Sequence, residues 1–196
     1  KHALGHKFTK YVSDNNATTT KDGTKTARCD NGCGTKNTVV DKGSKKTNPS
    51  QSPKIKIGQK LQNSVGVRCA ITGKNTAECI GYVGKKNSVT IPPSLKYMGV
   101  TYQITSIKTK AFSGNKNLRS IVIPSSIRTI GSQAFFNCKN LRNITIKTPY
   151  LSKKTVGAKA FKGIHAKAKI KVPKKQKKAY QKLLKAKGAG KKVTIK

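Results

Sequence analysis

Acidic side chains are scarce in this chain of 196 residues, which has 43 Lys and Arg, 5 Asp and Glu, and a net charge of +38. The acids are Asp14, Asp22, Asp30, Asp41 and Glu78, so every charged side chain after residue 78 is basic. Glycosidases and phosphoryl-transfer enzymes depend on Asp or Glu. Their chemistry is therefore excluded from the C-terminal part of the chain. A Gly-rich phosphate loop is missing as well, and we expect no enzyme.

Long apolar runs and aromatic residues are also lacking. No stretch approaches the roughly 18 apolar residues of a membrane-spanning helix, so we expect no membrane insertion. Only 6% of the residues are aromatic and there is no Trp, which leaves few rings on which nucleic-acid bases could stack. No signal peptide is recognisable. Because the chain begins at Lys1 rather than Met, we expect a fragment or mature product whose export signal lies upstream.

Arginine is rare among the many cations. Only Arg28, Arg68, Arg119, Arg128 and Arg142 are Arg, and the rest are Lys. Lys carries a hydrated point charge, whereas bidentate recognition of phosphate or guanine favours Arg. Such a surface attracts almost any polyanion at low salt. The composition therefore predicts diffuse attraction rather than specific recognition.

What the chain does contain is an internal repeat. The segment 111–124 reads like the segment 134–146, at an offset of 23 residues from Ala111 to Ala134, and a third copy opens at Ala160. The first two copies share an L-x-x-I-x-I core, formed by Leu118, Ile121, Ile123 and then Leu141, Ile144, Ile146. A period of about 20–29 residues with an L-x-x-L-x-L core is the signature of a leucine-rich repeat.

The repeat predicts an α+β fold, a short solenoid of parallel strands and short helical turns in which each repeat packs only on its neighbours. The Ala-Phe step of each copy should start a short helix or 3-10 turn. Its rings, Phe112, Phe135 and Phe161, should then fill the interior. Ile107, Ile130 and Val156 precede these steps and indicate a short extended stretch on a second side.

Changes in composition divide the chain into a small β-rich module over 1–47, a Ser/Pro linker over 48–58 and a repeat domain over 59–196. The repeat domain should comprise a cap over 59–104, repeats over 105–172 and a C-terminal cap over 173–196. Pro173 is suited to a helix start. An apolar stripe follows at Ala179, Tyr180, Leu183 and Leu184, and Gly188 suits the position after the helix.

Five cysteines argue against a complete disulfide framework. A hairpin with a loop over 73–75 would place residue 72 opposite 76 and Cys69 opposite Cys79. A Cys69–Cys79 disulfide in an exported protein is one interpretation, and two reduced, half-buried thiols are the other. Cys138 reads as a filler of the solenoid interior, because free cysteine is among the most buried residues. A nucleophilic Cys138 would need a histidine partner. The only histidine of the repeats, His165, lies in the next turn.

The N-terminal module offers candidate zinc ligands, His2, His6, Cys29 and Cys33, since zinc takes four nitrogen or sulfur ligands. The spacing is C-x3-C and only one such pair exists. These features favour a Cys29–Cys33 disulfide or two free thiols over a metal. We therefore expect no metal and no cofactor, and keep His6, Cys29 and Cys33 as the weaker alternative.

The repeat pattern A-F-x-x-[NC]-x-x-L-x-x-I-x-I-P-x-S-[IV]-x-x-I-G resembles the BspA-like leucine-rich repeats of bacterial surface proteins, over roughly 65–196. The Lys-rich helix and the ending at 193–196 are similar to those of Gram-positive gut bacteria. Residues 1–47 resemble a small Cys/His module that often precedes such repeats, with Leu4 and Thr19 or Thr20 in place of its first two cysteines. The resemblance implies export, surface display and ligand binding without a reaction.

The residues that alternate with the core isoleucines should form one exposed face of a parallel sheet. They are Ser88, Thr90, Ser120, Val122, Asn143, Thr145, Lys169, Lys171, Lys192 and Thr194, and those from Ser120 onward are our candidate ligand-binding residues. We expect a secreted or surface-attached monomer that contacts anionic cell-wall polymers, acidic host glycans or a host protein. The alternatives are a nucleic-acid-binding protein, with only non-specific binding, and a targeting or anchoring domain of a larger exported enzyme.

Overall fold

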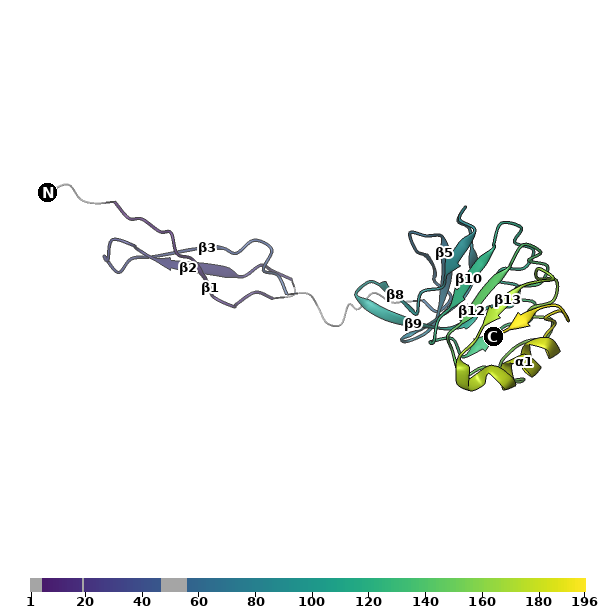
Figure 1. Cartoon of the computed structure of the whole chain (residues 1–196). Coiled ribbons are helices and arrows are strands. Elements are labelled where there is room, and N and C mark those ends of the chain that lie inside the picture. The colour runs from purple at the N-terminus through teal and green to yellow at the C-terminus, as the bar shows by residue number, and fades with distance from the viewer. Residues whose placement is uncertain (1–4, 19, 47–55) are drawn as a thin grey trace. The chain divides into compact units, whose positions relative to one another are not determined.

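A computed structural model describes residues 5–18, 20–46 and 56–196 (Figure 1). The chain divides into two compact units, 1–54 and 55–196. Most of the predicted linker lies outside the described residues. Its last part, 56–58, belongs to the second unit, where the N–H of Gly58 donates to the carbonyl of Ile71 at 2.8 Å. Within the described part, no helix is both long and apolar enough to cross a membrane.

The first unit is a three-stranded antiparallel sheet. Its strands are β1 (Val12–Ser13), β2 (Thr24–Arg28) and β3 (Lys36–Val40), with β2 in the middle. Positive φ angles at Gly32 and Gly43 mark two turns of this unit. The buried apolar residues described in this unit are Ala17, Ala27 and Cys29, so the unit has very little core.

The second unit begins with an antiparallel hairpin that forms its N-terminal cap. Strand β4 (Lys60–Gln62) pairs with β5 (Val67–Gly73), and β5 pairs with β6 (Thr76–Tyr82). The predicted loop over 73–75 is wrong, because Gly73 already pairs with Thr76 and only residues 74–75 connect the strands. A bulge between Ile71 and Gly73 absorbs the difference. Cys69 therefore still lies opposite Cys79, as predicted.

A second hairpin follows in the cap. After β7 (Ser88–Thr90), strands β8 (Ser94–Tyr97) and β9 (Val100–Ile107) pair antiparallel. Met98 and Gly99 connect them with φ of 49° and 77°. Two residues with positive φ are typical of a type I′ turn, whose twist matches that of the strands. Strand β9 is thereby directed alongside β6, with which it pairs in parallel.

The repeats form the five-stranded parallel sheet β14-β13-β12-β10-β7, whose members β10, β12 and β13 lie side by side in Figure 1. The strands added here are β10 (Ser120–Ile123), β12 (Asn143–Ile146), β13 (Lys169–Lys171) and β14 (Thr194–Ile195). Ile121 pairs with Ile144, and Ile144 with Ile170. All three are buried, which confirms the predicted orientation of the L-x-x-I-x-I core.

A second parallel ladder runs along another side of the solenoid, as predicted. Strand β11 (Thr129–Ile130) pairs with β9, which places Ile130 beside Ile107. A single bridge then joins Ile130 to Val156. All three side chains are buried, so each repeat is held to its neighbour by two hydrogen-bonded ladders.

The Ala-Phe segments form turns closed by hydrogen bonds between residues three apart, such as Ser113 N–H to Lys110 O at 3.1 Å and Phe136 N–H to Gln133 O at 3.0 Å. These turns agree with the predicted 3-10 turn and not with its alternative, a short helix. The residue before each Ala-Phe step has a positive φ, 58° at Lys110, 56° at Gln133 and 55° at Lys159. The fourth residue of each segment also has a positive φ, at Gly114, Asn137 and Gly163. A left-handed residue breaks an α-helix, and two of them flank each step. The segments also bond to each other, as in Phe112 N–H to Ala134 O at 2.8 Å.

The phenylalanines stack through the interior of these turns. The ring centroids of Phe112 and Phe135 lie 5.3 Å apart, and those of Phe135 and Phe161 lie 5.4 Å apart. The rings are nearly parallel, at 16° and 22°. This column confirms the predicted interior position of all three rings.

The C-terminal end is closed by the 3-10 helix η2 (Lys174–Gln176) and helix α1 (Lys177–Ala186). Helix α1 buries Tyr180, Leu183 and Leu184. Ala179, predicted in the same stripe, is exposed, because the three larger side chains already cover the end of the core. The N–H of Phe161 donates to the carbonyl of Lys187 at 3.1 Å, so the helix end continues the ladder of turns.

Candidate ligand-binding face

The outward residues of the parallel sheet form two rows, which we call the sheet face. Pairing aligns the first row as Ser88, Ser120, Asn143, Lys169 and Thr194, and the second as Thr90, Val122, Thr145 and Lys171. The side chains are exposed or half-buried. The predicted exposure of this face is confirmed. Whether these residues bind a ligand stays a prediction.

One predicted member of the sheet face is displaced. Thr194 pairs with Lys169 and not, as predicted, with Lys171. Lys192 therefore lies in the turn before β14, outside both rows. Lys196 continues the second row instead, since its N–H donates to Ile170 O at 2.9 Å and its carbonyl accepts from Val172 at 2.8 Å. The shift is two residues, so the same face stays outward.

A row of cations borders the sheet face where its strands begin. We call it the basic rim, and it consists of Lys85, Lys116, Arg119, Arg142 and Lys167. One hollow of about 300 Å³ contains Lys85, Lys116 and Arg119 together with Asn87, Asn117 and Asn140. A neighbouring hollow of about 250 Å³ contains Arg142, Lys167 and Lys169 together with Asn143 and His165. Cations and amide donors thus meet in both hollows.

The backbone spaces the two arginines of the rim one strand apart. The carbonyl of Arg119 accepts from the N–H groups of Arg142, at 2.9 Å, and Asn143, at 3.1 Å. No acidic side chain follows Glu78 in the chain. In the described residues, the single ion pair joins Lys25 to Asp41, in the first unit, at 3.6 Å. The positive charge of the rim is therefore not neutralised by the repeat domain.

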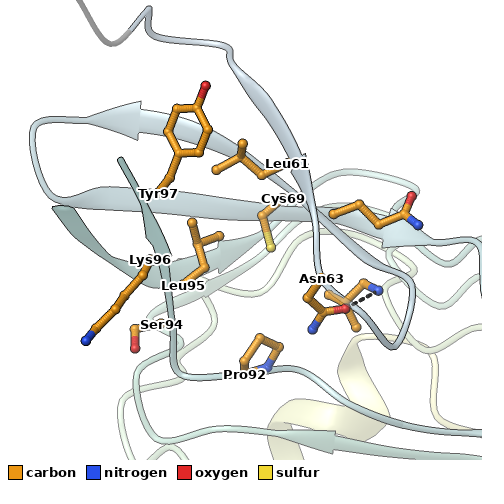
Figure 2. A pocket seen from close by; sticks show the side chains of 10 residues that line it. Leu61, Asn63, Cys69, Pro92, Ser94, Leu95, Lys96 and Tyr97 are labelled. Atoms are coloured by element: carbon orange, nitrogen blue, oxygen red, sulfur yellow. Dashed lines mark hydrogen bonds between the residues drawn. The ribbon is translucent and has the colours of Figure 1, made fainter. Parts of the chain in front are cut away.

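An apolar hollow of about 460 Å³ lies in the N-terminal cap (Figure 2). Figure 2 shows Leu61, Leu95 and the sulfur of Cys69 directed into it, while Lys96 extends away. Asn63 accepts a hydrogen bond from the N–H of Val67 at 2.8 Å and closes one side. Lys96 is the one cation among the residues that line this hollow, against three in each hollow of the rim, so it suits an anionic ligand less well.

The three cysteines of the repeat domain are buried. Cys69 and Cys79 face each other as thiols, and the hydrogen bond between them lowers the pKa of Cys69 and raises that of Cys79, which burial raises further. Their disulfide stays a prediction. Cys138 is fully buried and donates to the carbonyl of Phe112 at 2.9 Å. Burial raises the pKa of Cys138 to about 11. The ring of His165 accepts a hydrogen bond from the N–H of Lys167 and not from the Cys138 thiol.

In the first unit, the structure brings His6, Cys29 and Cys33 together. Their ligand atoms all lie within 4.8 Å of one another, and His6 Nδ1 is 3.2 Å from Cys33 Sγ. Hydrogen bonds from Cys33 and His6 lower the pKa of Cys29 to about 6. The fourth candidate ligand, His2, lies outside the described residues. The structure thus brings together the three residues that the sequence offered as the weaker, metal-binding alternative, and metal binding itself stays a prediction.

The basic rim was also missed from the sequence, although a signal was present. Arg119 and Arg142 stand at equivalent positions of the two best repeats, directly before the outward residues Ser120 and Asn143. Two of the five arginines therefore follow the repeat period. The signal is the position of these two arginines in the repeat, which the low number of arginines in the composition conceals.

The sequence pattern described as BspA type leucine rich repeat region (6 copies) matches residues 92–196. A comparison with curated proteins finds no match. Among solved structures, a leucine rich cell surface protein from Faecalibacterium prausnitzii A2-165 is similar at 22% identity and a TM-score of 0.46, over 59% of this chain and 37% of that one.

Two leucine-rich repeat proteins are also similar. One, from Bacteroides ovatus ATCC 8483, is 25% identical with a TM-score of 0.42, over 66% of this chain and 36% of that one. The other, from Bacteroides capillosus ATCC 29799, is 17% identical with a TM-score of 0.45, over 70% of this chain and 98% of that one. The chain spans little more than a third of the length of the first two. Since the repeat pattern covers more than half of it, the chain belongs to the BspA-type leucine-rich repeat family.

Proposed function

We propose that this chain is a non-catalytic binding module of a secreted or surface-attached bacterial protein, and that it holds anionic polymers. The basic rim supplies the charge and the sheet face supplies the adjoining polar surface. Cell-wall polymers with phosphate groups and acidic glycans carry the matching chemistry. The similarity to a cell surface protein from Faecalibacterium prausnitzii agrees with surface display.

The observation that carries the proposal is the periodic placement of the rim. Strands in a sheet lie about 4.8 Å apart, so Arg119 and Arg142 present their guanidinium groups at successive steps along the solenoid. Arg can bind a phosphate or carboxylate through two parallel hydrogen bonds. Asn117 and Asn140 repeat with the same period beside them. A polymer with regularly spaced anions would meet the same contacts in these two repeats.

Two further features support binding without catalysis. The repeat domain carries only one carboxylate side chain, Glu78, so a pair for general acid–base catalysis cannot form there. Its one cysteine within the repeats, Cys138, has a raised pKa and no exposed surface, whereas a nucleophilic cysteine needs an accessible thiolate.

The test compares two variants with the same change in charge. Arg119→Glu/Arg142→Glu removes the arginines of the rim, and Lys177→Glu/Lys178→Glu reverses two exposed cations on helix α1. Affinities for lipoteichoic acid, heparin and duplex DNA are measured from low to physiological salt. We expect the rim variant to lower affinity for lipoteichoic acid or heparin at least about tenfold at physiological salt, because charge-assisted pairs there are lost. The helix variant should change it much less.

Equal losses in both variants would show that attraction is diffuse and that the rim is not a site. Unchanged affinity in both would reject an anionic ligand and favour a protein partner. For DNA we expect a steep fall with salt and no dependence on base sequence, because the sheet face carries no aromatic side chain for stacking. A sequence preference would support the nucleic-acid alternative instead.

A further inference from the structure

We propose that the first unit binds one Zn²⁺ ion through His6 Nδ1, Cys29 Sγ and Cys33 Sγ, and that the ion fastens the N-terminal segment to the β2–β3 loop. The proposal is independent of the function proposed for the repeat domain. It concerns a unit whose buried apolar residues, in the part described, are two alanines and Cys29. Domains this small usually need a disulfide, a metal or a partner to stay folded.

The distances suit zinc. Zinc lies about 2.3 Å from a thiolate sulfur and about 2.0–2.1 Å from an imidazole nitrogen, so two ligand atoms on one tetrahedral ion are roughly 3.3–3.8 Å apart. The three atoms here lie within 4.8 Å of one another, and the His6–Cys33 pair is at 3.2 Å. Small adjustments of side chains would therefore complete the site. Thiolate and imidazole together favour zinc over calcium or magnesium.

The loop that carries both sulfurs is shaped by the backbone. Cys29 directly follows β2, and its N–H donates to Thr35 O at 2.8 Å. The carbonyl of Cys29 accepts from Gly32 at 3.1 Å. Gly32 and Gly34 flank Cys33 with φ of 74° and 77°, a left-handed conformation that glycine adopts without strain. This turn brings the sulfur of Cys33 back toward that of Cys29.

Hydrogen bonds from the same loop hold the segment that carries His6. Asp30 N–H donates to Lys7 O at 2.8 Å, and the Asn31 side-chain amide donates to Gly5 O at 2.6 Å. The Thr9 hydroxyl donates to the Asp30 carboxylate at 2.8 Å. These contacts flank His6 on both sides in the sequence. The imidazole is therefore positioned by groups that are not ligands, as in metal sites held by their surroundings.

The site is open on one side. His6 and Cys33 are exposed and Cys29 is buried, so a fourth position on the ion is not filled by any of the described residues. Two thiolates neutralise the charge of Zn²⁺, and binding adds no net charge to a chain that already carries +38. The proposed role is structural, because a metal that links residue 6 to residues 29 and 33 supplies folding free energy to the unit.

The same two sulfurs could instead form a disulfide, and the experiment separates the two outcomes. The full chain is reduced, freed of metal with a chelator and titrated with Co²⁺, whose visible absorption reports tetrahedral thiolate coordination. We expect one Co²⁺ per chain, displaced by one Zn²⁺. Loss of a group that only supports a metal ligand typically weakens metal binding about 10- to 100-fold. Cys33→Ser and His6→Asn each remove a ligand, and each should weaken Zn²⁺ binding by more than that.

The matched controls are Cys69→Ser and His165→Asn, which remove a thiol and an imidazole from the repeat domain and should leave Zn²⁺ binding unchanged. Hydrogen exchange of β2 and β3 amides provides a second measurement, and it should slow on adding Zn²⁺ in the parent chain but not in Cys33→Ser. No bound Zn²⁺ in the reduced chain, or equal binding in His6→Asn, would overturn the proposal. A disulfide would lower the mass of the native chain by two hydrogens, and this difference would disappear in Cys33→Ser. That result, together with no Zn²⁺ uptake after reduction, would assign the two sulfurs to a disulfide.

Discussion

The two units of the chain obtain their stability in opposite ways. In the repeat domain, apolar side chains from each repeat join one continuous core, and polar groups are mostly paired through backbone ladders. In the first unit, all four aspartates accept hydrogen bonds or form an ion pair, as when Asp14 accepts from Thr24 and Thr26 at 2.6 and 2.9 Å. The acids therefore hold the small unit together and are almost missing from the large one.

This difference explains how one chain tolerates such a high charge. A core of stacked repeats gains free energy from buried apolar area, which does not depend on surface charge. Exposed hydrogen bonds and ion pairs contribute much less to the free energy of unfolding than buried apolar area does. The repeat domain can therefore devote its surface to cations, whereas the first unit cannot lose its acids. Four predictions test this contrast.

The largest expected difference is in thiol protection. In the native, metal-free chain, Cys33 should react with an alkylating reagent at least about 10³-fold faster than Cys138, because Cys138 is reached only by unfolding and equilibrium constants for unfolding reach that size. Cys33 is exposed and Cys138 has no exposed surface. Mass spectrometry of a labelling time course measures both rates in one sample.

The pH dependence separates the two units further. The lowered pKa of Cys29, about 6, keeps its thiolate populated at neutral pH, so its relative reactivity should fall only as the pH drops through about 6. Cys138, with a pKa of about 11, should stay a thiol throughout this range. Zn²⁺ should protect Cys29 and Cys33 and leave Cys138 unaffected. Labelling of Cys138 as fast as Cys33 would contradict a single continuous core.

The next largest effect is on the phenylalanine column. Phe135→Ala should lower the free energy of unfolding of the repeat domain by about 3–5 kcal/mol, the range for a buried aromatic truncated to alanine. Phe135 is fully buried and stacks on a ring on either side. The adjacent Phe136 is only half-buried, so Phe136→Ala is the control and should cost clearly less. Urea denaturation measures both.

A loss below about 1 kcal/mol in Phe135→Ala would mean that the column does not support the domain. Amide exchange in β2 and β3 should be the same in both variants, because the first unit has its own contacts. Faster amide exchange of β2 and β3 in Phe135→Ala would show that the two units unfold together and do not obtain their stability separately.

The repeat pattern predicted the core and the outward face because both depend on local periodicity. The alternation of Ile144 and Ile146 with outward residues fixes which side of the strand is buried. The left-handed residues that flank the Ala-Phe turns were not predicted, because a residue such as Gln133 carries no distinctive side chain. Its conformation is stabilised by the next repeat, where Gln133 N–H donates to Ala158 O at 2.9 Å.

The candidate sites were predicted less well than the fold. The sequence offered His6, Cys29 and Cys33 only as the weaker alternative, because their meeting depends on contacts across the module, such as Asp30 to Lys7, which spacing alone does not reveal. The register of β14 was shifted by two residues, because the turn before it does not follow the repeat length. In each case the missing information was a long-range contact.

A smaller loss is expected where two repeats approach most closely. A Cβ at Gly131 would lie 2.3 Å from the backbone nitrogen of Thr109, in the preceding repeat. Gly131→Ala should therefore force the repeats apart and cost about 1–3 kcal/mol, as overpacking typically does. Gly5→Ala in the first unit is the control, since no atom lies within 4 Å of its Cβ position. A neutral Gly131→Ala in thermal or urea denaturation would show that the spacing of repeats is adjustable.

The smallest effect concerns charge at helix α1, whose first turn contains no acid and whose N-cap Gln176 makes no side-chain capping bond. Lys177→Glu/Lys178→Glu should stabilise the domain, because each acid at a helix N-terminus contributes about 0.3–1 kcal/mol at low ionic strength. Any Lys→Glu change also relieves repulsion within a chain of charge +38. The control is therefore Lys185→Glu/Lys187→Glu at the other end of the helix, with the same change in charge and an unfavourable dipole. The difference between the two variants in urea denaturation isolates the dipole effect, and it should shrink as salt screens exposed charges. Equal stabilisation by both variants would show that overall charge repulsion, and not the interaction of charges with the helix dipole, limits the stability of this part of the repeat domain.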